Sequence, residues 1–162
     1  MVPIISFVGR HDSGKTTLLT KVVNHFNNQN VKVGVIKHAH HELIIPDTKD
    51  SEKLFNAGAA VVYSNSPNTQ IIYSRSELKA LTEIIEAIEK EVDIIILEGY
   101  KEEPYPKIEV MREAISQEPL PISNVIARIL DFKLETDSPV PEFAFEDVSQ
   151  ICEFILSYVS SS

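Results

Sequence analysis

The stretch Gly9-Arg10-His11-Asp12-Ser13-Gly14-Lys15-Thr16 fits the pattern G-x-x-x-x-G-K-[ST] of a phosphate-binding loop, the P-loop. The apolar run at residues 4–8 precedes it and predicts a buried strand, and residues 15–28 carry apolar side chains at helical spacing. A strand before the loop and a helix after it are the context in which this pattern binds a nucleotide. The stretch therefore predicts a nucleotide-binding α/β protein.

Each residue type in the loop has a physical task. Two glycines allow a tight turn and a close approach of backbone N–H groups to phosphates, and the following helix adds the positive end of its dipole. Lys15 reaches the β- and γ-phosphates, and we expect it to face solvent without a ligand. Thr16 is placed to ligate Mg²⁺, and Thr17 to contact the α-phosphate. The expected nucleotide-binding residues of the loop are Gly9, His11, Asp12, Ser13, Gly14, Lys15, Thr16 and Thr17.

The composition is that of an acidic globular protein. The 162 residues suit one domain, residues 1–162, and 15 Lys+Arg against 24 Asp+Glu leave a net charge of −9. This balance argues against nucleic-acid and anionic-membrane partners, which need a basic surface. Cys152 is the only cysteine, so an internal disulfide is excluded, and we expect it in the core. No apolar run is long enough for a membrane span and no basic leader precedes the first strand, so we expect a cytoplasmic protein.

Strand and helix patterns alternate along the rest of the chain. Apolar runs predict strands at residues 31–37, 59–63, 70–73, 92–99, 107–111 and 124–130. Helical periodicity predicts helices at residues 51–57, 77–91 and 146–159, the first of them capped by Ser51. This alternation predicts an α/β three-layer P-loop NTPase fold with a mostly parallel sheet.

A second element of a phosphate site follows the apolar run Ile94-Ile95-Ile96-Leu97. The run ends at Glu98, and an acid at the end of a buried strand commonly holds the Mg²⁺ shell of a P-loop protein. Asp50, beyond the strand at 31–37, could meet Mg²⁺ as well, although an Asp at a helix start also complements the helix dipole. We therefore expect Thr16, Glu98 and Asp50 as metal ligands.

The residues alone leave the nucleotide and its use open. The N-K-x-D motif that reads guanine is absent, and Asp131 at a strand end is the positional candidate, so ATP stays open. His38, His40 and His41 allow a metal-delivery GTPase, although a polar loop near the phosphates is the better explanation of them, since no Cys or second cluster completes a tetrahedral site. A small-molecule kinase would need an arginine-rich lid, and residues 112–121 hold one arginine.

The motifs resemble the molybdopterin-guanine dinucleotide biosynthesis protein B family over residues 1 to 131. The resemblance rests on the segments Gly14-Lys15-Thr16-Thr17-Leu18-Leu19, Gly34-Val35-Ile36-Lys37-His38-Ala39-His40-His41, Lys49-Asp50-Ser51, Ala57-Gly58-Ala59-Ala60, Leu97-Glu98-Gly99-Tyr100-Lys101, Lys107-Ile108 and Val125-Ile126-Ala127. The chain departs from the family pattern at Thr48, where a glycine is usual.

This resemblance implies a single P-loop GTPase-like domain that binds GTP with Mg²⁺ and forms a homodimer. It implies a supporting role when a guanine nucleotide is attached to molybdopterin in molybdenum cofactor biosynthesis, with the molybdenum cofactor guanylyltransferase as partner. Asp131 would lie near the guanine, and Asp50 and Glu98 near the metal. No water-positioning Gln and no arginine finger stand out, so we expect a slow GTPase or a GTP-binding adaptor.

Overall fold

The computed structural model describes residues 2–39, 42–75, 80–134 and 138–161. Contacts divide the chain into two compact units: Met1–His38 with Ile85–Ser162, and Ala39–Ile84. The second unit is thus an insertion between two parts of the first in the sequence. A single domain over residues 1–162 stays a prediction.

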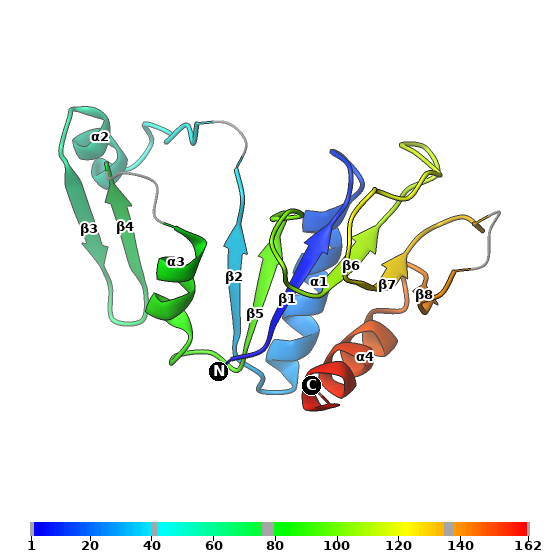
Figure 1. The fold of residues 1–162 in the computed structure, drawn as a ribbon. Coiled ribbons are helices and arrows are strands. Elements are labelled where there is room, and N and C mark those ends of the chain that lie inside the picture. Colours follow the sequence, from blue (N-terminus) through cyan, green and yellow to red (C-terminus); the bar gives the residue numbers. More distant parts are fainter. Residues whose placement is uncertain (1, 40–41, 76–79, 135–137, 162) are drawn as a thin grey trace. The chain divides into compact units, whose positions relative to one another are not determined.

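The first unit is built on a six-stranded sheet in the order β2-β5-β1-β6-β7-β8, in which every neighbouring pair is parallel (Figure 1). The strands are β1 (Ile4–Val8), β2 (Val33–Lys37), β5 (Ile94–Glu98), β6 (Lys107–Val110), β7 (Val125–Ile129) and β8 (Glu142–Phe143). Their carboxyl ends share one edge. From β1 the chain continues to β2 on one side, while β6 lies on the other, and such a reversal of direction marks the ligand crevice of open α/β sheets.

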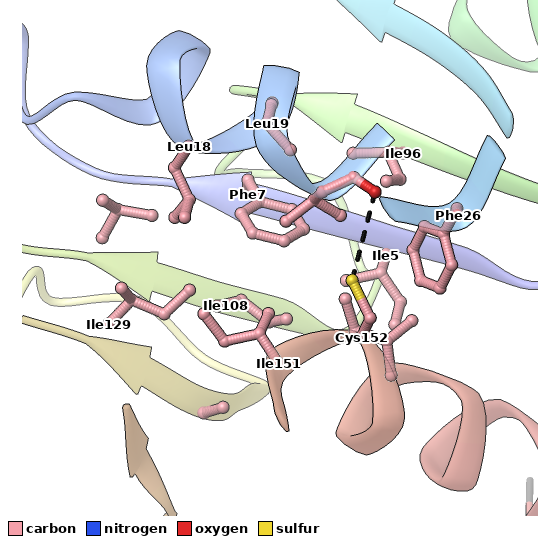
Figure 2. Packing of buried hydrophobic residues seen from close by; sticks show 14 of the residues in the cluster. Ile5, Phe7, Leu18, Leu19, Phe26, Ile96, Ile108, Ile129, Ile151 and Cys152 are labelled. Carbon is pink, nitrogen blue, oxygen red and sulfur yellow. Dashed lines mark hydrogen bonds between the residues drawn. The ribbon is translucent and has the colours of Figure 1, made fainter. Parts of the chain in front are cut away.

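One face of this sheet is apolar and is covered by α1 (Lys15–Asn28) and α4 (Val148–Ser161). Figure 2 shows side chains from both helices meeting those of the strands in one cluster. Leu18, Leu19, Val22 and Phe26 form the buried stripe of α1, as the helical spacing predicts. Cys152 lies in the same core, as expected, and burial raises the pKa of its thiol to about 12.

The opposite face of the sheet carries buried polar side chains. The ammonium of Lys107, a residue only 1% exposed, donates to the carbonyl oxygens of Glu103 at 2.6 Å and Tyr105 at 2.9 Å. Glu109 is 1% exposed as well and accepts hydrogen bonds from Arg128 Nε at 3.0 Å and the Leu120 N–H at 2.6 Å. Loops that supply backbone partners therefore cover this part of the sheet.

The last turn of α3 (Leu81–Ile88) packs on the same polar-bearing face, beside β2. A Cβ at Gly34 would lie 3.0 Å from the Cδ1 atom of Ile88, so the helix approaches the strand backbone closely. Helices therefore cover both faces of the parallel sheet, which confirms the expected α/β class.

The second unit consists of α2 (Asp50–Asn56) and an antiparallel hairpin of β3 (Val61–Asn65) and β4 (Gln70–Ser74). Phe55 connects the helix to the hairpin. Its ring lies 5.7 Å from that of Tyr73, and the guanidinium of Arg75 stacks 4.3 Å above it. This face of the hairpin is half-buried.

Three details differ from the sequence-based expectations. Ser51 does not cap α2; instead the Glu52 carboxylate accepts from the Thr48 hydroxyl and from the N–H groups of Thr48 and Lys49, and this lowers its pKa. The expected helix at residues 77–91 is α3, which ends at Ile88 and whose predicted beginning falls outside the described residues. The two-residue strand β8 carries no periodic pattern and was not predicted.

Candidate functional site

The P-loop joins the end of β1 to α1. A Cβ at Gly9 would lie 2.4 Å from the carbonyl oxygen of Val110, so only glycine lets the loop pass over β6. Gly14 precedes α1 in the left-handed conformation with φ +84° and offers no side-chain cap to the helix. The first turn of α1 contains no acidic residue. The helix therefore begins without a side-chain cap and with an uncompensated positive dipole, an arrangement that favours an anion.

Lys15 is half-buried and bonded to its own loop, so the expectation that it faces solvent in the free protein holds only in part. Its ammonium donates to the carbonyl oxygens of Gly9 at 3.2 Å and Arg10 at 2.6 Å, and to Ser13 Oγ at 3.3 Å. Burial is the main cause that lowers its pKa, and the nearby Glu98 carboxylate opposes this effect. The loop oxygens thus take the place that an anionic ligand would fill.

On one side of the loop, Thr16, Lys37 and Glu98 form what we call the glutamate flank. Thr16 Oγ1 donates to Glu98 Oε1 at 2.6 Å, and the ammonium of Lys37 lies 3.2 Å from the hydroxyl and 3.1 Å from the same carboxylate oxygen. The sheet creates this arrangement, because β5 lies between β1 and β2 and Glu98 is in register with both Phe7 and Lys37.

These residues fit a divalent cation. Hydroxyl and carboxylate oxygens are the ligands that Mg²⁺ accepts, and a cation, the Lys37 ammonium, already lies against both oxygens. Asp50, the third expected ligand, begins α2 in the second unit, with its side chain 99% exposed and 3.7 Å from Lys53. The structure thus brings Thr16 and Glu98 together, whereas a metal role for Asp50 stays a prediction.

On the other side of the loop, Arg112, Asp131 and Phe145 form what we call the arginine flank. The Arg112 guanidinium stacks 4.0 Å above the Phe145 ring and donates to Asp131 Oδ2 at 3.2 Å, while the Glu113 N–H donates to Asp131 Oδ1 at 2.8 Å. A Cβ at Gly14 would lie 3.1 Å from Arg112 Nε, so the guanidinium packs against the start of α1. Asp131 therefore orients Arg112 beside the P-loop.

The remaining expected residues of the loop differ in exposure. Ser13 is buried, with 1% of its surface exposed, whereas Thr17 is exposed on the first turn of α1. His11 and Asp12 are exposed, their side chains pair at 2.9 Å, and Asp12 has a left-handed φ of +59°. Contacts of these residues with a nucleotide stay a prediction.

The histidine cluster is described only in part. The His38 N–H donates to the carbonyl oxygen of Glu98 at 3.0 Å, and its ring lies 5.0 Å from that of Tyr100. His40 and His41 lie outside the described residues. In the part of the chain that the structure describes, no three His, Cys, Asp or Glu side chains gather to hold a metal ion.

Sequence reasoning missed two cations of this site, Lys37 and Arg112. The sequence could have indicated Lys37, because this residue ends a predicted strand, and a parallel sheet can place that strand beside the one that ends at Glu98. No sequence pattern indicates Arg112, since it follows β6 in an irregular loop and its partners come from distant segments.

Comparisons with known proteins agree with this architecture. The family model described as molybdopterin guanine dinucleotide synthesis protein B matches residues 4–131. A Haemophilus influenzae protein, named molybdopterin-guanine dinucleotide biosynthesis adapter protein, is 29% identical over 98% of this chain and 90% of its own. A Bacillus subtilis protein, named as a probable adapter of the same kind, is 30% identical over 96% of this chain and 92% of its own.

The fold is matched by solved structures too. The crystal structure of Bacillus subtilis MobB superposes with a TM-score of 0.78 at 29% identity, covering 96% of each chain. Among the described residues, no helix combines the length and apolarity that a membrane span requires. The chain therefore belongs to the molybdopterin guanine dinucleotide synthesis protein B family.

Proposed function

We propose that this protein binds GTP with Mg²⁺ at the P-loop and serves as an adapter in the attachment of a guanine nucleotide to molybdopterin. The observation that carries the proposal is the uncapped, acid-free start of α1, with Lys15 beside it and Thr16 bonded to Glu98. Relatives named as adapters of molybdopterin-guanine dinucleotide biosynthesis support the biological role. The partner that we propose is the molybdenum cofactor guanylyltransferase.

The protein's own groups would divide the work of binding. Lys15 exchanges the loop oxygens for phosphate oxygens, and the free N–H groups of α1 and the loop donate to the same phosphates. Thr16 and Glu98 would hold Mg²⁺, which would supply positive charge to offset the negative charge of the phosphate oxygens. Residues 9–16 and 99–106 contain no glutamine that could orient an attacking water. We therefore propose slow turnover at most, with nucleotide binding as the main role.

The arginine flank is the proposed base end of the site. A carboxylate offers about four lone-pair positions. Asp131, which uses one position on each oxygen, can therefore still accept the two N–H donors of guanine. Adenine presents no such pair of donors at this edge. This difference supports GTP over ATP and favours the adaptor over the kinase.

Calorimetric titration of GTP and of ATP, each with Mg²⁺, tests this proposal directly. We expect a one-to-one complex with GTP and binding of ATP that is at least about tenfold weaker. Equal or stronger binding of ATP would contradict the base assignment and favour the kinase. Absence of binding by either nucleotide would remove the proposed function as a whole.

A homodimer is also part of the proposal, and the hairpin of the second unit supports it. Val61, Tyr63 and Ile72 share one face of β3 and β4 and are 50%, 61% and 49% exposed. That face carries no charge, whereas the chain as a whole has a net charge of −9. It is therefore better suited to pack against the same face of a second copy than against an acidic part of that copy's surface. Sedimentation analysis should show a dimer for the wild type and a monomer for Tyr63→Glu; a monomeric wild type would contradict this.

A further inference from the structure

We propose that Lys37 is a tethered cation that occupies the divalent-cation position between Thr16 and Glu98 and has to leave when Mg²⁺ arrives. The proposal rests on the proposed nucleotide binding and adds a regulatory residue to that site. It predicts that Lys37 decides how strongly nucleotide binding depends on Mg²⁺.

Geometry is the first support. The ammonium of Lys37 lies 3.1 Å from Glu98 Oε1 and 3.2 Å from Thr16 Oγ1, and these two oxygens are themselves 2.6 Å apart. A lysine ammonium has three donors and no acceptor, so it meets the two oxygens as a metal ion would, by positive charge. It holds the donor set together while no divalent ion is bound.

Exposure is the second support. The side chain of Lys37 is 56% exposed, whereas that of Glu98 is 10% exposed. The lysine thus reaches into the site from solvent on a flexible stem and can withdraw to water at little cost. Glu98 cannot move away, because its strand is buried at every position between β1 and β2. The mobile partner of the pair is therefore the cation.

Charge balance is the third support. Burial and the ammonium of Lys37 lower the pKa of Lys15, while the Glu98 carboxylate raises it more than any other group does. One carboxylate thus faces two ammonium groups. A divalent ion on the same oxygens would repel Lys37, since like charges a few ångströms apart oppose each other strongly away from bulk water. Mg²⁺ and Lys37 are therefore alternatives at one position.

Two consequences follow for nucleotide binding. Without Mg²⁺, Lys37 screens Glu98 from the triphosphate, so the wild type keeps part of its affinity in the presence of EDTA. With Mg²⁺, the lysine competes with the ion. Removing the charge of Lys37 should raise the dissociation constant for GTP in EDTA, because Glu98 is no longer screened. It should lower the dissociation constant in Mg²⁺, because the ion has no competitor. Both effects raise the ratio of the first constant to the second.

The experiment measures this ratio with a fluorescent GTP analogue for the wild type, Lys37→Met and Lys21→Met. Lys21 is exposed on α1 and loses the same charge, so it serves as the matched control. We expect the ratio to rise about tenfold in Lys37→Met, the size of one charge-assisted hydrogen bond, and to stay near the wild-type value in Lys21→Met. In Lys37→Arg, which keeps the charge, the ratio should lie close to the wild type.

Other outcomes overturn the inference. An equal loss of affinity in EDTA and in Mg²⁺ would make Lys37 an ordinary phosphate contact, and unchanged affinity in both would give it no role. A ratio in Lys37→Arg as high as in Lys37→Met would show that charge is not the cause. In all three cases the wild type still binds GTP and the proposed function stands, whereas a wild type that binds no nucleotide removes both.

Discussion

The glutamate flank and the arginine flank of the P-loop neutralise charge in different ways. On the glutamate flank, a fixed carboxylate faces lysine ammonium groups, one of which is largely exposed. On the arginine flank, the guanidinium of Arg112 is stacked on Phe145 and bonded to Asp131. A lysine is a mobile point charge, whereas an arginine can be held by its plane and its donors together. The glutamate flank is therefore suited to exchanging one cation for another, whereas the arginine flank holds its guanidinium in one fixed position.

The largest expected effect comes from removing the lysine of the P-loop itself, which belongs to neither flank. Lys15→Ala should weaken GTP binding at least about 100-fold, because two charge-assisted hydrogen bonds to phosphates are worth about 1.5–3 kcal/mol each. Calorimetry would measure the affinity, with Lys21→Ala as the matched control on the same helix. Circular dichroism should show an intact fold. Wild-type affinity in Lys15→Ala would contradict the use of the loop.

The second prediction breaks the glutamate flank alone. In Glu98→Gln the carboxylate that pairs with Thr16 and Lys37 is lost, so the Mg²⁺ concentration needed for half-maximal GTP binding should rise about tenfold. Binding in EDTA should change much less, since Lys37 already screens the Glu98 charge from the triphosphate when no Mg²⁺ is bound. A Mg²⁺ titration of fluorescent GTP binding measures both. An unchanged Mg²⁺ requirement would remove Glu98 from the metal site.

The third prediction breaks the arginine flank alone. Arg112→Ala loses an exposed ion pair and a stacking contact, so the free energy of unfolding should fall by about 1 kcal/mol. Asp131 then loses its orientation, and the preference for GTP over ATP should narrow about threefold while the Mg²⁺ requirement stays as in the wild type. Urea unfolding and paired calorimetry measure these quantities. A changed Mg²⁺ requirement would show that the two flanks are not independent.

The smallest expected effect uses pH to separate the P-loop lysine from the arginine flank. Since the folded protein lowers the pKa of Lys15, the unfolded chain binds more protons just below the ordinary lysine pKa. The free energy of unfolding from this group should therefore rise with pH in that interval. Lys15→Met should lack this component. Arg112→Met should keep it, because a guanidinium does not titrate there. Urea unfolding of the three proteins across the interval measures the slopes, and identical slopes would contradict the half-buried position of Lys15.

Local patterns determined much of this protein. Glycine positions predict the P-loop. Apolar runs and helical periodicity predict the boundaries of β1 and α1 and the acid that ends β5. These features depend on neighbours in the sequence, which is why the sequence by itself predicts them. The family resemblance rests in part on these segments and is confirmed.

Only the tertiary structure decided which charges meet. Lys107 and Glu109 alternate with apolar residues in β6, yet both are buried, because the loops before and after the strand cover that face and supply hydrogen-bond partners. Strand order likewise places Lys37 beside Glu98, and loop closure places Arg112 over Phe145. Register and loop closure join residues far apart in the chain, so no local pattern encodes them.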